Sequence, residues 1–290
     1  MATVTNTSKN TVNKNIIVPE VYAGLVDQKI AGKVVIAQAA DRIGTLMGQV
    51  GETINFPSWV YNFDAKDIKP GEAIPTTKMK QDNRQATIKM IAPDGISVND
   101  YDDAVAFGNA LTKAVDFQAT GIARKIDADL IADAYATPLK YALAKDGEVT
   151  FAEMNGILGM YGDDCNASDF RFIAVHSAYI PSFLTMDGFV SAELTHTTNG
   201  SGILMNNQLG YFRGIPVVVT DRLYDSKTQE KFILAIKTGS LAIIPKESVH
   251  VETARDASTR TTTVYTSEYL ATCLVDDSGI VLAKKTLPIA

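Results

Sequence analysis

Few side chains in this sequence are of a type and spacing that could do chemistry. The three histidines, His176, His196 and His250, are far apart in the chain, so the sequence offers few residues from which to build a histidine triad or a zinc cluster. His176 follows an apolar run and could act as a general base, although an imidazole that ends a strand is more often structural. An enzyme that uses His176 or an unrecognised carboxylate is therefore one hypothesis to weigh against non-catalytic functions.

The cysteines and acidic pairs add little to that hypothesis. Cys165 and Cys273 have no C-x-x-C spacing and no clustered histidine, so we expect both to be reduced and buried. The acidic pairs at 163–164 and 276–277 lack the ligand spacing of a calcium loop and are expected to be solvated turns. Nucleophile-elbow, P-loop, zincin and dinucleotide-binding motifs are absent. The sequence predicts no enzyme, no cofactor and no catalytic or metal-binding residue.

Composition excludes several other classes. The chain has 290 residues, 46% of them hydrophobic and 21% charged, which is enough to build a large core. Its net charge of −6 means that the surface as a whole does not attract polyanions. No apolar run approaches the roughly 20 residues of a membrane helix, and the N-terminus is polar. We expect a protein that stays in the cytoplasm where it is made and has no membrane partner.

The elements that must position any functional residue begin with a polar arm. Residues 1–18 are rich in Thr, Asn, Lys and Ser, and we expect a flexible arm that a partner would order. Residues 19–32 have the apolar spacing of a short helix, and residues 33–40 read as an apolar strand-like run.

The segment from 50 to 98 contains two strand candidates joined by a long polar middle. Thr53 to Phe56 and Thr87 to Met90 alternate apolar and polar residues, which predicts that the two ends pair as a hairpin. The polar middle exceeds the usual loop length of a compact domain, so we expect it to project from the body and to find partners elsewhere. A disordered surface loop is the alternative.

The strongest pattern is a long helix over residues 100–135. Asn99 is a good N-cap, three aspartates follow it, and apolar residues then recur every three or four positions. Such a helix spans on the order of 50 Å and is a spine for other elements. The alternative is two helices broken at Gly121.

The remainder predicts an α/β lobe followed by long strands that return to the spine helix. We expect helices at 150–161 and directly after His176, and a loop at 184–203. The expected strands are 170–175, 215–221, 232–236, 241–244, 248–253, 261–274 and 279–283.

This order of elements, together with several short motifs, resembles a known family. The motifs are GETINFP at 51–57, KPGEAIP at 69–75, FIAVHSAYIPSFL at 172–184, GYFRGIPVVVTD at 210–221 and ETARD at 252–256. The whole chain resembles the major capsid proteins of tailed double-stranded DNA bacteriophages, whose fold is shared with encapsulin shell proteins.

The resemblance implies an α+β fold of the phage major-capsid type. Its parts would be an N-terminal arm with a short helix, an extended loop that is a long β-hairpin, a peripheral domain built on the spine helix and strands, and an axial α/β domain. The implied boundaries are 1–48 for the arm and short helix, 49–98 for the extended loop, 99–138 for the spine helix, 139–245 for the axial domain and 246–290 for the C-terminal strands of the peripheral domain.

The resemblance also implies a function. The chain would be a structural subunit that assembles with itself, as hexamers and pentamers, into an icosahedral virion head made in the host cytoplasm. Its other partners would be a separate scaffolding protein, a portal, and packaged double-stranded DNA bound without sequence specificity. The alternatives are an encapsulin-like compartment shell and another phage structural protein, such as a tail tube or an adhesin.

Within that family, four residues are candidates for contacts between subunits. Trp59, Tyr61 and Phe63 would anchor the extended loop on an adjacent copy, the alternative being burial on their own subunit. Arg255 would pair with a carboxylate of a neighbour, the alternative being a local surface pair. The isopeptide cross-link known in some family members is not expected, because the chain after Asn207 contains no asparagine.

Overall fold

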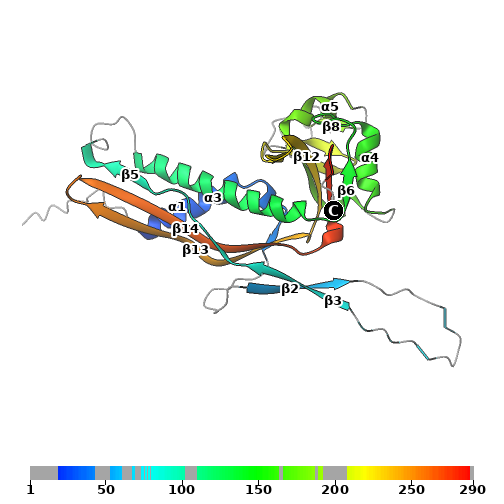
Figure 1. Cartoon of the computed structure of the whole chain (residues 1–290), viewed down its shortest axis with the longest axis horizontal. Helices are drawn as coiled ribbons and strands as arrows, with labels where there is room; N and C mark the ends of the chain where they lie inside the picture. The colour runs from blue at the N-terminus through cyan, green and yellow to red at the C-terminus, as the bar shows by residue number, and fades with distance from the viewer. Residues whose placement is uncertain are drawn as a thin grey trace, which may run out of the picture.

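A computed structural model of the chain shows an elongated body beside a rounded lobe (Figure 1). It describes residues 19–42, 53–60, 80–101, 110–162, 166–186, 189–191 and 208–287, with isolated residues between 67 and 78. The predicted arm at 1–18 lies outside these residues. The mixed helix and sheet content confirms the predicted α+β class.

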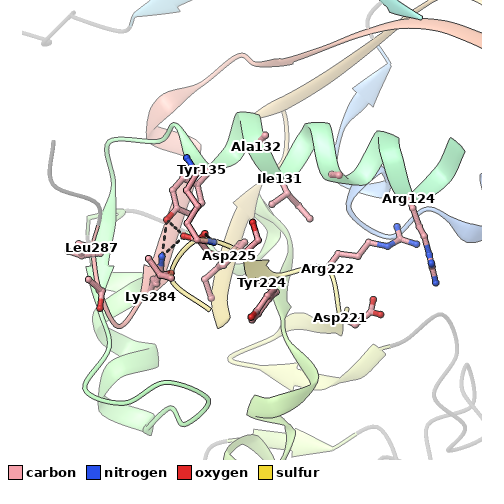
Figure 2. A pocket seen from close by; sticks show the side chains of 16 residues that line it. Arg124, Ile131, Ala132, Tyr135, Asp221, Arg222, Tyr224, Asp225, Lys284 and Leu287 are labelled. Carbon is pink, nitrogen blue, oxygen red and sulfur yellow. Dashed lines mark hydrogen bonds and ion pairs between the residues drawn. The ribbon is translucent and has the colours of Figure 1, made fainter. Parts of the chain in front are cut away.

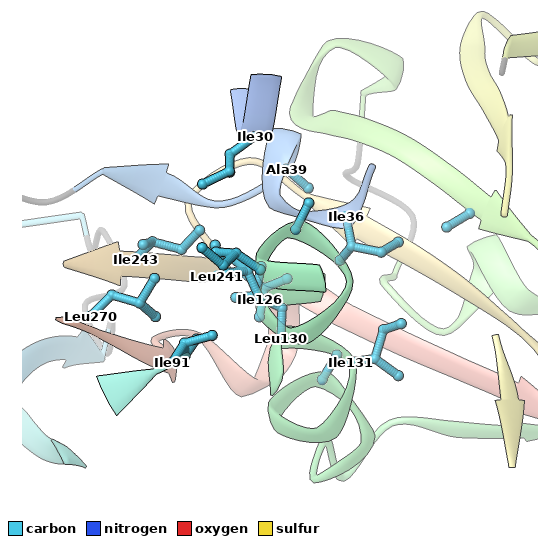
Figure 3. Packing of buried hydrophobic residues seen from close by; sticks show 14 of the residues in the cluster. Ile30, Ile36, Ala39, Ile91, Ile126, Leu130, Ile131, Leu241, Ile243 and Leu270 are labelled. Carbon is cyan, nitrogen blue, oxygen red and sulfur yellow. The ribbon is translucent and has the colours of Figure 1, made fainter. Parts of the chain in front are cut away.

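The elongated body is a layer of helices on one face of a sheet. Helices α1 (Pro19–Lys33) and α3 (Ala110–Tyr135) pack on a sheet of order β1-β13-β14-β4, with β5 also paired to β14. The strands are β1 (Asp41–Arg42), β4 (Lys89–Ile91), β5 (Ile96–Asn99), β13 (Leu241–Asp256) and β14 (Thr261–Leu274). Figure 3 shows the buried residues that α1, α3 and the strands bring together, Ile30, Ile126 and Leu270 among them.

Helix α3 confirms the predicted spine over its described length. It runs unbroken through Gly121, so the alternative of two helices is wrong. The side chain of Asn99 accepts a hydrogen bond from the Tyr101 amide at 3.0 Å, as an N-cap does. Residues 102–109, between this cap and α3, lie outside the described part of the chain.

The lobe is built on a second sheet, of order β6-β15-β12-β7-β10-β9-β8, with β11 paired to β12. Its strands are β6 (Lys140–Ala142), β7 (Phe170–Val175), β8 (Phe189–Ser191), β9 (Gln208–Phe212), β10 (Ile215–Val219), β11 (Tyr224–Asp225), β12 (Glu230–Lys237) and β15 (Ile280–Lys284). The lobe's helices are α4 (Phe151–Gly159) and α5 (Ile180–Leu184), and the 3-10 turns are η2 (Ala167–Asp169), η3 (Ser177–Tyr179) and η5 (Asp277–Gly279).

This second sheet contributes to two cores, one on each face. Ile173 and Val175 of β7 belong to the core of the lobe, whereas Phe172 and Ala174 belong to the core beneath the spine helix. Strands β12 and β15 alternate in the same way, as strand geometry requires. The lobe and the elongated body therefore share their central strands.

The predicted hairpin is present and stands apart from both sheets (Figure 1). Strands β2 (Thr53–Val60) and β3 (Lys80–Thr87) pair in antiparallel register from Thr53↔Thr87 to Val60↔Lys80. Its root is attached to its own body, because Ala86 packs against β13 and β14 and Arg84 forms an ion pair with Asp277.

Three local predictions were wrong. Residues 33–40 form no strand but contain the 3-10 turn η1 (Ile36–Gln38), because the Asp127 carboxylate accepts the amides of Val35 and Ala37 at 2.9 Å each. The strands expected at 241–244 and 248–253 are one strand, β13, with irregular register between Pro245 and His250. The segment 184–203, expected as a loop, contains β8.

Candidate functional site

A cavity of about 780 Å³ lies between the second half of α3 and the segment 221–228 that leads into β12 (Figure 2). Ala128, Ile131 and Ala132 of α3 line it together with Phe232, so its floor is apolar. Charged side chains stand at its two ends, Lys284 and Asp225 at one and Arg124 and Arg222 at the other.

Lys284 lies at the first end of the cavity and is almost completely buried, with 1% of its side chain exposed. Its Nζ donates to Asp225 Oδ2 at 2.6 Å and to the Tyr135 hydroxyl at 3.1 Å, and lies 3.6 Å from Glu230 Oε2. Tyr135 also donates to Asp225 at 3.0 Å. These contacts tie the end of β15 to α3, to β11 and to the start of β12.

The two partners of this ion pair are both held in their charged forms. Burial opposes the charge on Lys284, but hydrogen bonds to Asp225 and Tyr135 outweigh it and raise the pKa of the lysine. The hydrogen bond from Lys284 lowers the pKa of Asp225 well below its usual range, although burial opposes this. Lys284 is therefore protonated at neutral pH, and an ammonium ion is not a nucleophile. Its hydrogen bonds to Tyr135 and Asp225 instead stabilise the fold.

Arg222 stands at the other end of the cavity and is paired with a completely buried carboxylate. Its Nη1 forms an ion pair with Asp127 Oδ2, and the Asp127 side chain is 0% exposed. Burial, together with the nearby charge of Arg124, lowers the pKa of Arg222. Because Asp127 also accepts the two amides of the α1–η1 connection, this pair joins α1, α3 and the lobe.

Arg255, a residue singled out from the sequence, is paired within its own chain. Its two terminal nitrogens donate to the two oxygens of Asp100 at 2.7 and 2.5 Å, and Nη1 also donates to Thr262 at 2.7 Å. The hydrogen bond from Arg255 lowers the pKa of Asp100. The structure thus contains the local surface pair that was the alternative, and a contact of Arg255 with a neighbouring subunit stays a prediction.

The three aromatic candidates belong to the hairpin and the segment beyond it. Trp59 lies in β2 opposite Gln81, and its side chain is outside the described part of the structure. Tyr61 and Phe63 fall wholly outside it. Trp59 and Arg255 belong to different elements, the hairpin and the distal end of β13.

His176 has a structural hydrogen bond. Its Nδ1 accepts the amide of Ala178 at 3.1 Å and so caps η3, while burial and the charge of Lys231 lower its pKa. His250 is exposed, with Nε2 3.4 Å from Glu252. Among the described residues, no group of three or more His, Cys, Asp or Glu side chains could hold a metal ion.

Cys273 is buried and unpaired, as predicted, and burial raises the pKa of its thiol to about 11. His196, Cys165 and the acidic pair at 163–164 lie outside the described residues. No helix in the described ranges combines the length and apolarity needed to cross a membrane.

The cluster around Lys284 was not predicted from the sequence. A signal was present, because Lys284 ends the apolar run of β15 in a strand expected to be covered. Its partners Asp225 and Tyr135 are 59 and 149 residues away in the chain, so no local pattern could have named them.

Comparisons with known proteins agree with this architecture. The chain is 29% identical over 276 residues to the major capsid protein of Staphylococcus phage phiMR11, covering 95% of this chain and 96% of that protein. The similarity extends over nearly the whole length of both chains. The resemblance noted in the sequence is therefore confirmed, and with it the function of a major capsid protein. No protein-family model matches the chain.

Solved structures show the same fold at low sequence identity. The structure of Mycobacterium phage Che8 aligns with a TM-score of 0.62 and 17% identity, over 88% of this capsid protein and 92% of that chain. A virus-like particle from Pyrococcus furiosus aligns with a TM-score of 0.61 and 9% identity, over 92% of this chain and 100% of the other.

Proposed function

We propose that copies of this capsid protein assemble, as hexamers and pentamers, into an icosahedral virion head that encloses double-stranded DNA. The observation that carries the proposal is the β2–β3 hairpin, whose eight paired positions extend roughly 27 Å at about 3.4 Å per residue. A two-stranded hairpin is at best marginally stable by itself in water. Contact with a second copy supplies the apolar surface that it needs.

Four residues are proposed to make these contacts. Trp59, Tyr61 and Phe63 anchor the distal hairpin on an adjacent subunit, because Trp and Tyr are enriched among the few residues that supply most of the binding energy of an interface. Arg255 contacts a neighbour at the distal end of β13, where its pair with Asp100 leaves both side chains about half exposed.

The chain is proposed to divide into five segments and to act with several partners. The segments are the arm and short helix 1–48, the extended loop 49–98, the spine helix 99–138, the axial domain 139–245 and the C-terminal strands 246–290. A separate scaffolding protein and a portal assist assembly in the host cytoplasm, and the DNA is bound without sequence specificity. Neither catalysis nor a membrane is part of the proposal.

An encapsulin-like compartment shell is the second candidate, favoured by the likeness to the Pyrococcus furiosus particle. The two candidates differ in what the shell holds. The relative in phage phiMR11, similar over nearly the whole chain, favours the phage head.

Electron microscopy of the purified chain, alone and coexpressed with its scaffolding protein, tests the proposal. Closed shells or rings of five and six copies are expected, whereas discrete small oligomers under both conditions would overturn it. Trp59→Ala is expected to reduce the yield of shells without unfolding the subunit. Tyr211→Ala, which removes an exposed aromatic side chain on β9, is the matched control and should leave the yield unchanged.

A further inference from the structure

A hollow of about 450 Å³ opens where the end of α1 and the turn η1 meet α3. Three cationic side chains line it, those of Lys33, Arg124 and Arg222, and no carboxylate does. The uncharged lining consists of Gln38 and Thr120, whose side chains can form hydrogen bonds, and of Gly32, Val34 and Val35. This concentration of positive charge stands out in a chain whose net charge is −6.

Two of the three cations are held in place by the fold. Lys33 donates to Thr120 Oγ1 at 2.6 Å and to the Asp116 carbonyl oxygen at 2.8 Å. Arg222 is fixed by its ion pair with Asp127, and its Nη2 lies 3.4 Å from the carbonyl oxygen of Lys33. Both side chains are thus ordered before any ligand arrives.

Arg124 is the third cation, exposed on α3 and without a carboxylate partner among the residues that the structure describes. Figure 2 shows its guanidinium group close to that of Arg222. Like charges that lie together repel each other, and an anion between them would relieve the repulsion.

Neighbouring acidic groups neutralise only part of the positive charge around this hollow, and Arg124 keeps its charge unpaired among the described residues. Asp116 already shares its carboxylate with Lys29 at 2.5 Å and with Lys33 at 3.7 Å, and Lys113 adds positive charge near it. Asp127 is buried and paired with Arg222. Asp221 lines the adjoining cavities beside Arg222 but not this hollow.

We propose that this hollow binds a phosphate group of the enclosed nucleic acid, so that the end of α1 and this part of α3 face the interior of the shell. The inference rests on the proposed function. Planar guanidinium groups match the oxygens of a phosphate, and backbone phosphates carry no sequence information. Val34 and Val35 are the apolar side chains of the lining and offer little surface to a peptide segment, which favours a phosphate over a protein carboxylate.

Salt-dependent binding of labelled duplex DNA to free full-length subunits tests the inference. Removing one phosphate contact lowers the slope of log affinity against log salt by about 0.9. Arg124→Gln is therefore expected to lower the slope by about one and the affinity several-fold at low salt. Arg124→Lys should restore most of the slope, since it keeps the charge.

Lys145→Gln is the matched control, because it removes the same charge from an exposed loop of the lobe, where Lys145 is 70% exposed and pairs with Glu148. Its slope should equal that of the wild type. An equal decrease of the salt slope in both variants would mean that only net charge affects DNA binding, and it would overturn the proposed site. So would the absence of duplex binding, or displacement of the duplex by polyglutamate as effectively as by competing DNA.

Inorganic phosphate, added to each variant at constant ionic strength as a competitor of duplex DNA, distinguishes a site for free phosphate from a site for the phosphates of nucleic acid. If inorganic phosphate competes with duplex DNA for the wild-type subunit but not for Arg124→Gln, the result supports a phosphate site. Binding of inorganic phosphate without binding of duplex DNA overturns the nucleic-acid assignment. Microscopy of the same preparations keeps the inference apart from the proposed function. Shells that form normally while the slope is unchanged by Arg124→Gln would refute the inference alone.

Discussion

At the scale of single residues, the charge of Glu268 conflicts with its surroundings. It lies on β14 on the same face as Val264, Thr266 and Leu270, which point toward the helices. Its Oε2 is buried and has no hydrogen-bond partner among the described residues. Burial and the charge of Asp27 raise its pKa to about 7, and Arg42 only partly opposes them.

The substitution Glu268→Gln should therefore stabilise the subunit at alkaline pH. Because the folded-state pKa of about 7 exceeds the ordinary value of 4.5, the folded state binds more protons between these values. The free energy of unfolding thus falls as pH rises through this window and stays low above it. The variant should gain up to about 3 kcal/mol near pH 8 and little near pH 5, measured by chemical denaturation. Glu252→Gln, 75% exposed on β13, should leave the pH dependence unchanged, and the same gain in both variants would contradict the explanation.

The buried ion pair at the cavity predicts an asymmetry between two substitutions. Asp225→Asn leaves the ammonium of Lys284 buried with one counter-charge fewer, which should cost about 3–5 kcal/mol. Lys284→Met removes the more deeply buried charge and leaves Asp225, which is 15% exposed and keeps its hydrogen bond from Tyr135, so it should cost less. Thermal unfolding of both variants measures the difference. Equal losses would show that the charge on Lys284 does not set the cost.

At the scale of elements, the patterns that the sequence revealed were those with local causes. The helix at 150–161 was predicted from its cap, and the structure shows a capping box in which Thr150 and Glu153 exchange hydrogen bonds. Strands β7 and β14 have the predicted bounds, because their apolar residues and flanking turns are contiguous in the sequence.

The elements that were missed depend on residues far away in the chain. The turn η1 replaces the expected strand at 33–40 because Asp127, some 90 positions later, accepts two of its amides. The hollow beside Arg124 likewise forms only when α1, α3 and the lobe meet, and the cavity beside Lys284 forms only when α3 and the lobe meet. Folding alone brings these charges together, and no spacing rule anticipates them.

The hairpin makes an element-scale prediction about assembly. The register ends at Val60↔Lys80, so residues 61–79 can be replaced by an Asn-Gly turn that suits a two-residue hairpin. The shortened subunit should keep its melting temperature, since the hairpin root at Ala86 is retained, but should form no shells. Calorimetry and electron microscopy measure the two properties. Normal shells from this variant would show that the distal hairpin is dispensable.

At the scale of the whole molecule, the shared sheet predicts cooperative unfolding. Strands β7, β12 and β15 supply one face to the core beneath α3 and the other to the core of the lobe. Loss of either core exposes the strands that support the other. We expect calorimetry of free subunits to show one transition, with equal calorimetric and van't Hoff enthalpies. Two resolved transitions would contradict this.

The shared strands also limit how a wall of these subunits can bend. A swing of the lobe against the spine would pull Phe172 and Leu234 away from one layer while their neighbours Ile173 and Ile233 stayed fixed in the other. Packed interiors resist such shear because they have few voids. Each subunit is therefore rigid. Differences in curvature between regions of a shell built from these subunits must be accommodated by changes at the interfaces between subunits.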